Sequence, residues 1–258
     1  MFKLHRITKA LGFILFLPLT IFAQTDKSDT LNWKASLDVT GFWQSGNVDT
    51  WIFRAKSDVR FKPSSKLVFR TKNSYLYQEF GKEKADEDIL SLNFLNIGPE
   101  RNFSPLLLAF VSSNFRREIE LRSLLGVGVT YQVFKKEDNW LKFAVSSEYE
   151  STNFNASDFN RNEYDGSTSI QTFRGTLWAN GRYHLFNNKM VFNHESFYQP
   201  SLERGNNYRW QIDLGLELPI KKSLSFKVNY IHTYESIVIQ GQHEADRFLT
   251  FGLSLKNY

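Results

Sequence analysis

Three residues of the types used in nucleophilic catalysis stand near one another late in the chain. His194 and Ser196 are two positions apart in VFNHESFYQP, and Asn206 follows in ERGNNYRW. A histidine can act as general base toward a serine hydroxyl, and an amide side chain can orient the imidazole. Residues two apart on a strand point to the same face. The three residues are therefore one candidate for a hydrolase site. Whether their side chains come together depends on the strands and loops that carry them.

Other chemistry has less support in the residue types. The chain has no Cys, so disulfides and thiolate metal sites are excluded, and no glycine-rich phosphate loop or metal-binding helix motif occurs. Of the other four histidines, His5 lies in the first residues of the chain, and His184, His232 and His243 fall on different segments. The acidic stretch EKADED at 83–88 could bind a divalent cation weakly, but a solvated loop is the preferred interpretation. We therefore expect no cofactor and no resident metal.

Strict alternation of apolar and polar residues runs through most of the chain. In residues 31–61 one phase carries apolar side chains such as Leu37 and Val39, and the other carries Asp38 and Lys56. A period of two indicates strands with one apolar face, and no helical period of useful length appears. Twelve segments show the pattern, the fourth being apolar on both faces: 32–44, 50–62, 66–79, 88–98, 105–117, 120–134, 139–152, 168–185, 189–200, 207–219, 223–236 and 246–258.

The connections between these segments alternate in length. The even-numbered ones are mostly tight, as in KPSSK and PIKKS, whereas several odd-numbered ones are longer, as in STNFNASDFNRNEYDGS and IVIQGQHEAD. Alternating short turns and longer loops are typical of an up-and-down barrel in an outer membrane, with the turns on the periplasmic side. An even strand count would place both termini on that side. We therefore predict one all-β, antiparallel, transmembrane barrel of about twelve strands.

Large aromatic residues mark both ends of the apolar phase. Trp33 and Trp43 are ten positions apart, as are Trp51 and Phe61. Ten residues of tilted strand rise about 25 Å, the height of the apolar band of such a barrel. Rings with one polar edge favour the membrane interface. The predicted interface residues are Trp33, Trp43, Trp51, Phe61, Tyr208, Trp210 and Tyr234.

The opposite phase carries charges of both signs, which suits a wet lumen where opposite signs pair across strands. A soluble sandwich or lipocalin-like barrel also alternates, with its apolar face inside. Aromatic residues at both rims, segments of twelve or more residues and the mixed charge favour the membrane barrel. The predicted lumen residues are Arg54, Lys56, Asp58, Arg60, Arg122, Glu148, Arg174, Arg182, Glu195, Arg209, Asp213, Glu217 and Lys227.

The chain begins with a predicted secretory signal peptide. Residues 1–23 combine a basic start, the apolar run ALGFILFLPLTIF and Ala23 at a plausible cleavage point, which leaves 24–258 as a single barrel domain. Cleavage would remove three basic residues and no acidic one, leaving 29 basic and 27 acidic residues. Without a net positive field, nucleic acid is not an expected partner. The expected location is the outer membrane of a Gram-negative bacterium.

Two stretches resemble known sequences. The end RFLTFGLSLKNY, with Gly252, Leu253, Leu255 and Tyr258, resembles the terminal signal read by the bacterial barrel-assembly machinery, although Tyr258 is out of phase with the two leucines. The first hairpin GFWQSGN, TWIFRAKSDVRF and the third segment SYLYQEF resemble the YdiY-like family of salt-induced outer-membrane proteins, DUF481. That resemblance implies a barrel and supplies no catalytic or binding residues.

The residues His194, Ser196 and Asn206 resemble the site of outer-membrane phospholipase A, a twelve-stranded barrel with a lipid-facing His-x-Ser pair and a downstream Asn. That resemblance implies a lipid hydrolase, but the flanking residues and the spacing to Asn206 differ from the family's. We therefore predict a narrow passive pore or a structural envelope protein and not an enzyme, with the hydrolase as alternative. The expected partners are outer-membrane lipids, lipopolysaccharide and the assembly machinery, and the sequence does not indicate an oligomeric state.

Overall fold

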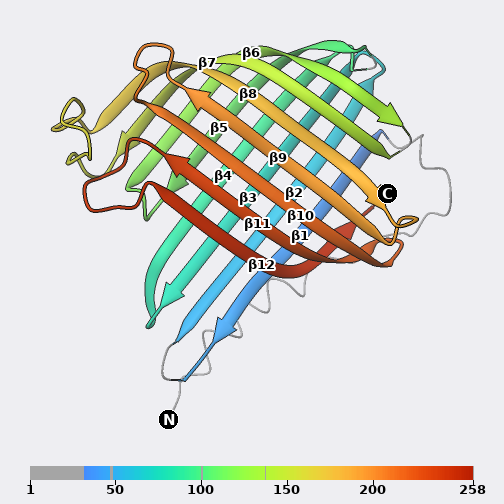
Figure 1. Ribbon diagram of the computed structural model, residues 1–258, viewed down its shortest axis with the longest axis horizontal. Helices are drawn as coiled ribbons and strands as arrows, with labels where there is room; N and C mark the ends of the chain where they lie inside the picture. Colours follow the sequence, from blue (N-terminus) through green and yellow to red (C-terminus); the bar gives the residue numbers. More distant parts are fainter. Residues whose placement is uncertain (1–31, 47–48, 100, 137, 258) are drawn as a thin grey trace.

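The computed structural model describes residues 32–46, 49–99, 101–136 and 138–257, which form one closed antiparallel barrel (Figure 1). Each strand pairs with its neighbours in sequence, and β12 pairs with β1 to close the ring. The predicted all-β fold with twelve strands is confirmed. The strands are β1 Trp33–Gln44, β2 Thr50–Ser64, β3 Leu67–Phe80, β4 Glu83–Ile97, β5 Phe103–Asn114, β6 Ile119–Lys136, β7 Asn139–Phe154, β8 Ser169–Leu185, β9 Met190–Pro200, β10 Tyr208–Lys221, β11 Leu224–Glu235 and β12 Ala245–Lys256.

The two ends of the barrel differ. At one end, which we call the turn end, the connections are short, as at 65–66, 186–189 and 222–223; the chain also enters β1 and leaves β12 there. At the other, the loop end, the connections 155–168, 201–207 and 236–244 are longer. The alternation read from the sequence therefore holds for most connections. The predicted signal peptide, 1–23, lies outside the described residues.

One predicted connection was wrong. The acidic stretch EKADED belongs to β4, which begins at Glu83, and the loop before it is reduced to the two residues Gly81 and Lys82. Both have positive φ, 59° and 72°, the geometry that lets a two-residue turn follow the twist of its flanking strands. The acidic residues are thus fixed in a ladder with β3 and do not form a solvated cation-binding loop.

Closure of the barrel depends on close approach at the seam between β1 and β12. Gly252 lies opposite Thr40, and a Cβ atom on Gly252 would collide with the backbone oxygen of Val39. The neighbouring Leu253 and Leu255 point outward, beside Val39 and Leu37 respectively. Three of the four predicted assembly-signal residues therefore lie in the closing strand. Tyr258 is outside the described residues.

Two long connections pack together at the loop end. Phe159 of the 155–168 loop pairs with Ile239 of the 236–244 loop, and Gln240 N donates to Asp158 O at 2.7 Å. Phe159 is almost completely buried and meets the ring of Phe154 edge-on, with centroids 5.0 Å apart. The loops thus share a small apolar core with the ends of β6, β7 and β8, formed by Ile119, Phe154, Phe159, Tyr164, Ile170, Ile237 and Ile239. This core gives the loop end a fixed structure on one side.

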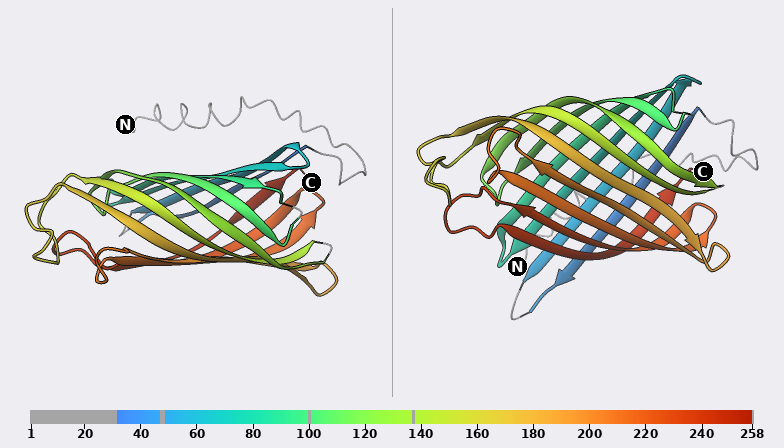
Figure 2. Two further views of the ribbon diagram at one scale, coloured as in Figure 1. Left: turned by 90° about the horizontal axis from the view of Figure 1, so that it is seen from above. Right: turned by 45° about the horizontal axis from the view of Figure 1, so that its top comes forward.

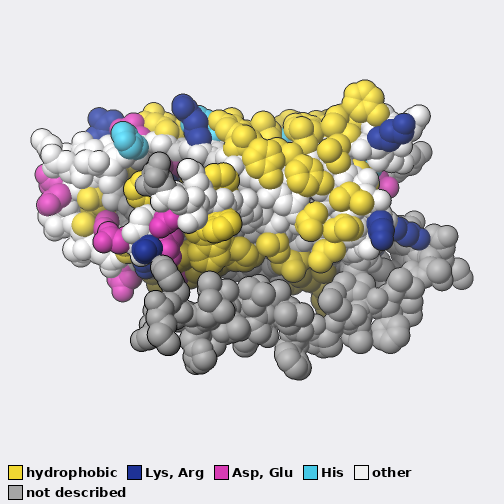
Figure 3. Space-filling view, turned by 90° about the horizontal axis from the view of Figure 1, so that it is seen from below, with side chains coloured by type: hydrophobic (Ala, Val, Ile, Leu, Met, Phe, Trp, Pro, Cys, Tyr) yellow, Lys and Arg dark blue, Asp and Glu magenta, His cyan; other side chains and the backbone are white. Residues whose placement is uncertain are grey.

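The outer surface is apolar over the middle of the barrel (Figure 3). The barrel is a flattened tube with strands that run obliquely to its long axis (Figure 2). Outward side chains such as Val39, Val127 and Leu177 are 42%, 60% and 57% exposed, whereas inward charged residues such as Glu148 and Glu150 are buried. Among the described residues, no helix is long and apolar enough to cross a membrane. Apolar residues lie outside and charged residues inside, the reverse of the pattern in soluble proteins. A barrel surrounded by membrane lipid requires this arrangement.

The outward position of Val39 leads to a prediction about the stability of the barrel. Val39→Arg should lower the free energy of unfolding in lipid vesicles by about 2–4 kcal/mol, because it places a charge midway between the aromatic ends of β1. The control Val39→Met keeps an apolar side chain and should change it by less than about 1.5 kcal/mol. Urea titration of the refolded proteins measures both. Equal effects of the two substitutions would show that this face does not contact hydrocarbon.

Candidate functional site

The charged side chains of the barrel interior form the candidate site, because they connect walls that are far apart in the ring. Lys72 of β3 pairs with Glu195 of β9. These strands lie six places apart in a ring of twelve, the greatest separation that the barrel allows. A direct contact between them means that side chains from opposite walls meet in the lumen.

Further pairs surround this contact. Lys56 Nζ of β2 lies 2.8 Å from Asp213 Oδ2 of β10, and Asn229 Nδ2 donates to the same carboxylate at 2.7 Å. Lys227 pairs with Asp38 across the β11–β12–β1 side. Arg182 approaches Glu217 at 3.8 Å, near the turn end. The oppositely charged groups thus compensate one another within the lumen.

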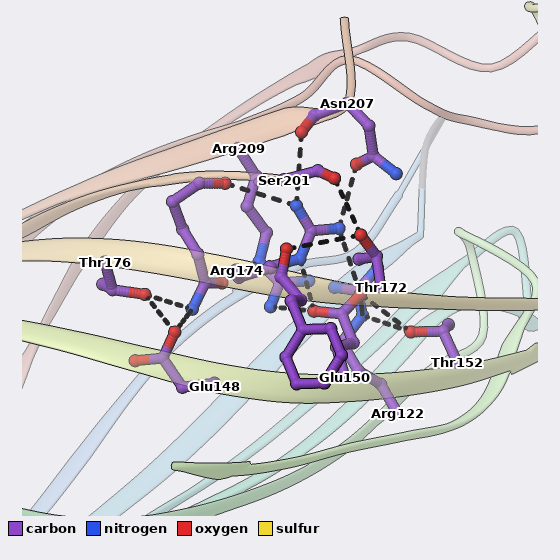
Figure 4. A network of polar contacts seen from close by, with 12 residues as sticks. Arg122, Glu148, Glu150, Thr152, Thr172, Arg174, Thr176, Ser201, Asn207 and Arg209 are labelled. Carbon is purple, nitrogen blue, oxygen red and sulfur yellow. Dashed lines mark hydrogen bonds and ion pairs between the residues drawn. The ribbon is translucent and has the colours of Figure 1, made fainter. Parts of the chain in front are cut away.

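A second, more deeply buried network lies toward the loop end (Figure 4). Glu150 accepts hydrogen bonds from Arg174 Nε at 2.7 Å and from Arg209 Nη2 at 2.6 Å. Arg122 donates from both terminal nitrogens to the two oxygens of Glu235, each at 2.8 Å. This bidentate geometry is the strongest form of guanidinium–carboxylate contact. The network joins β6, β7, β8, β10 and β11, so it fixes these strands relative to one another.

Glu148 is held differently, by neutral groups. Its carboxylate accepts hydrogen bonds from Thr176 Oγ1 at 2.7 Å and Gln199 Nε2 at 3.4 Å, and from Ser146. Gly126 on β6 leaves room for it, since a Cβ there would lie 2.5 Å from Glu148 Cγ. A glycine is therefore required at position 126, because any side chain there would collide with the inward side chain of Glu148.

An apolar cluster fills the interior beside these networks. Trp178 of β8 packs edge-on against Phe94 of β4, with centroids 6.1 Å apart, and against Phe197 of β9 at 5.0 Å. Phe110 lies under the guanidinium of Arg209, 5.9 Å from the ring centroid. The space left among these side chains is a cavity of about 20 Å³, roughly one water molecule. The cluster explains why the fourth segment is apolar on both faces: one face meets the outside and the other this interior cluster.

The remaining predicted lumen residues, Arg54, Asp58 and Arg60, all belong to β2. Arg54 is buried beside the ring of Phe248, with its guanidinium carbon 5.4 Å from the centroid. Asp58 pairs with Arg70 on the adjacent strand, and Arg60 lies exposed near the turn end. Among the partners of the predicted lumen residues, Lys72, Arg70 and Asp38 stand in the polar phase that the alternation predicts to face the lumen, and Glu235, which was not predicted, stands in the inward phase as well. The phase of these residues can be read from the sequence, but their pairing cannot.

The predicted interface aromatics lie on the outer surface near the strand ends. Trp33 is opposite Phe61 toward the turn end, and Trp43 is opposite Trp51 toward the loop end. Tyr208, Trp210 and Tyr234 form a stack toward the loop end, in which the rings of Trp210 and Tyr234 are 5.8 Å apart and inclined by 8°. The ten-residue spacing therefore produces cross-strand aromatic pairs at both ends of the first hairpin.

The hydrolase candidate is not assembled. His194 and Ser196 both point outward from the middle of β9, and His194 stacks against Tyr183 at 5.8 Å. The register places Leu214 opposite His194 and Ile212 opposite Ser196. Asn206 precedes β10, which begins at Tyr208, and its side chain bonds to Glu163 in the loops. From Tyr208 to Leu214, the residue opposite His194, β10 extends over six residues, about 20 Å, and Asn206 lies beyond Tyr208 in the loop, so Asn206 cannot orient the imidazole.

Two other features were considered for chemistry, a metal site and the first connection between strands. The described residues contain no group of three or more His, Cys, Asp or Glu side chains arranged to hold a metal ion. In the first connection, Asp49 accepts hydrogen bonds from Ser45 Oγ at 2.9 Å and Gly46 N at 3.3 Å, which lower the pKa of its carboxyl. Asn47 of the Ser45-Gly46-Asn47 motif lies outside the described residues. The first connection is thus a local turn structure held by Asp49.

The fold and the filled, charged interior define a transmembrane β-barrel of the outer-membrane type. The model of the family described as "Protein of unknown function, DUF481" matches residues 93–256, and the chain belongs to that family. The sequence matches no curated protein closely enough to count as a relative.

Several solved barrels are similar in structure. The NanC porin is 14% identical, with a TM-score of 0.53, and the match covers 85% of this chain and 98% of that one. The translocator domain of the autotransporter NalP from Neisseria meningitidis is 11% identical, with a TM-score of 0.45 and coverage of 96% and 97%. The KdgM porin is 11% identical, with a TM-score of 0.44 and coverage of 86% and 98%. At these identities, the similarity to NanC is one of fold.

The deep network makes a second stability prediction. Glu150→Gln should lower the free energy of unfolding by about 3 kcal/mol or more, because it leaves the buried charges of Arg174 and Arg209 without their carboxylate. The exposed Glu120→Gln removes the same charge and should change stability by less than about 0.5 kcal/mol. Urea titration in vesicles compares the two. If both variants are as stable as the wild type, the network does not hold these strands together.

Proposed function

We propose that the chain is a passive outer-membrane barrel with a constricted lumen, which conducts small ions slowly and excludes larger solutes. The observation that carries this proposal is the contact of Lys72 with Glu195 between strands on opposite sides of the ring. An open pore keeps its inward side chains along the walls, whereas here they meet in the middle. The apolar cluster of Phe94, Trp178 and Phe197 narrows the lumen further.

The proposal includes a route to the membrane. The signal peptide, 1–23, directs export and is removed after Ala23. The assembly machinery then reads the closing strand, including Gly252, Leu253, Leu255 and Tyr258. The turn end faces the periplasm, and the loop end faces the outside and the lipopolysaccharide leaflet, in keeping with the short and long connections of outer-membrane barrels.

A lipid hydrolase is not favoured. The distance of Asn206 from His194 leaves the imidazole without an orienting amide, and Glu195, next in sequence, points inward to Lys72. Without such a group, the serine lacks the activation that nucleophilic catalysis requires. We therefore propose that the barrel has no enzymatic activity.

Single-channel conductance tests the proposed lumen. The wild-type protein in a planar bilayer should show a small conductance, because the opposite-wall pair occupies the lumen. The double substitution Lys72→Ala and Glu195→Ala removes both partners at once, leaves neither charge alone, and should raise the conductance several-fold.

The matched control removes an ion pair outside the lumen. Lys84 and Glu87 pair at 3.0 Å on the outer face of β4, so Lys84→Ala with Glu87→Ala should leave the conductance unchanged. A large wild-type conductance, or an equal rise in the two double variants, would contradict the constricted lumen. A double variant of Lys72 and Glu195 that stays silent would favour a structural envelope role over a pore.

A further inference from the structure

The strands β2, β3 and β4 lie side by side in the ring (Figure 1), and their outer face carries polar side chains in the middle of each strand. Ser57 of β2 lies opposite Asn73 of β3, which in turn lies opposite Ser91 of β4. The next pair toward the turn end is Thr71 and Asn93. We call these five residues the polar patch. All are uncharged, and all can form hydrogen bonds.

Inward contacts of the neighbouring residues fix the outward direction of the patch. Lys72 pairs with Glu195 inside the lumen, so the residues on either side of Lys72 point outward. Leu92 lines the interior cavity, so the residues on either side of it point outward as well. Lys56 reaches another strand across the lumen, which places Ser57 on the outer face. The polar patch therefore belongs to the surface that faces the membrane.

Aromatic pairs enclose the patch along the strands. Toward the turn end, Phe61 lies opposite Phe69. Toward the loop end, the ring of Trp51 meets the ring of Tyr77 edge-on, with centroids 5.6 Å apart. Aromatic girdles mark the two interfaces of an outer-membrane barrel, so residues between them lie at the depth of the hydrocarbon.

Other strands are apolar at this depth. The outward residues in the middle of β6, β10 and β12 are Leu125, Val127, Val129, Ile212, Leu214, Leu216, Leu249, Phe251 and Leu253. Hydrocarbon offers no hydrogen-bond partner, so a polar side chain that faces it carries an energetic cost that an apolar one does not. Polar residues gathered on three adjacent strands therefore indicate a face that contacts protein and not acyl chains.

The patch satisfies part of its hydrogen-bonding capacity internally. Asn73 Nδ2 donates to Ser57 Oγ at 3.3 Å and to Thr71 Oγ1 at 3.2 Å. Asn93 Nδ2 donates to Ser91 Oγ at 3.1 Å. None of the described residues donates to the side-chain oxygen of either asparagine. These oxygens remain as acceptors, and the hydroxyl groups keep their own hydrogens to donate.

We propose that the polar patch is the interface with a second copy of this chain, related by a two-fold axis normal to the membrane. A two-fold interface places the same surface on both sides, so it requires a surface that is complementary to itself. Amide and hydroxyl groups meet this requirement, because each offers a donor and an acceptor. Without charge, two copies of the patch do not repel each other.

The second copy supplies what the lipid lacks. Hydrogen bonds between polar side chains hold protein surfaces together inside a membrane, since acyl chains do not compete for them. The interface lies on the outer wall, so the inference does not depend on whether the lumen conducts.

Cysteine cross-linking locates the interface, since the chain has no Cys of its own. The single variants Ser57→Cys, Thr71→Cys and Ser91→Cys are refolded into vesicles and oxidised. At least one should form a disulfide-linked dimer, because a two-fold axis through the patch brings equivalent residues close together. Leu214→Cys, outward on β10, is the control and should stay monomeric. No dimer in any patch variant, or an equal yield at Leu214, would contradict the proposal.

The strength of association gives the second measurement. In sedimentation equilibrium in density-matched detergent, Asn73→Leu with Asn93→Leu should raise the dissociation constant of the dimer about tenfold or more, because the hydrogen bonds across the interface are lost. An apolar side chain suits a lipid-facing position, so the variant barrel remains folded, which circular dichroism checks.

The matched control removes two outward polar side chains from the opposite wall. His194→Leu with Ser196→Leu changes the middle of β9, which lies six places from β3 in the ring, and should leave the dissociation constant unchanged. A wild type that is monomeric at every concentration, or an equal loss in both double variants, would overturn the proposal. Cross-linking of the patch to a different protein in native membranes, without a dimer of this chain, would overturn it as well.

Discussion

The structure depends on the pairing of charges that the barrel encloses. An ion removed from water is costly unless an opposite charge and hydrogen bonds replace its hydration, and losing one partner leaves the other exposed to that cost. Glu150 has two arginines within 2.7 Å, and Arg122 has both oxygens of Glu235. Because these partners come from different strands, satisfying the charges also fixes the distances between walls.

The need to pair buried charges follows from the membrane-facing outer surface of the barrel. A strand that faces lipid on one side must place its polar residues on the other, where the lumen receives them. In a flattened ring of twelve strands, long side chains from opposite walls reach one another, and Lys72 meets Glu195. The lumen is filled by the residues that the membrane excludes from the outer face, and the aromatic cluster around Trp178 occupies the part that the ion pairs leave.

Much of the fold was predictable from the period of two, and much of the interior was not. Alternation places Val39 outward and Asp38 inward, and it sets the strand bounds within a few residues for most strands. It does not say which inward residue meets which, because partners such as Lys72 and Glu195 lie 123 positions apart and are brought together only by closure and tilt.

Three local errors have the same kind of origin. EKADED looks like a polar loop because its composition is acidic, yet Gly81 and Lys82 suffice for the turn. Asn206 shares a phase with Ser196 in the sequence, but the loop before β10 continues to Asn207. Phe94 and Trp178 break the expected polar lumen, since an interior that is already filled by side chains accepts apolar ones at little cost.

A double-mutant cycle between Lys72 and Glu195 tests the meeting of opposite walls most directly. The free energies of unfolding of the wild type, Lys72→Ala, Glu195→Ala and the double variant give the coupling between the two side chains. The structure predicts a coupling of about 1 kcal/mol or more, because the two charged groups are in contact within the lumen. Effects that add within about 0.5 kcal/mol would show that the two walls do not meet, and would contradict the constricted lumen.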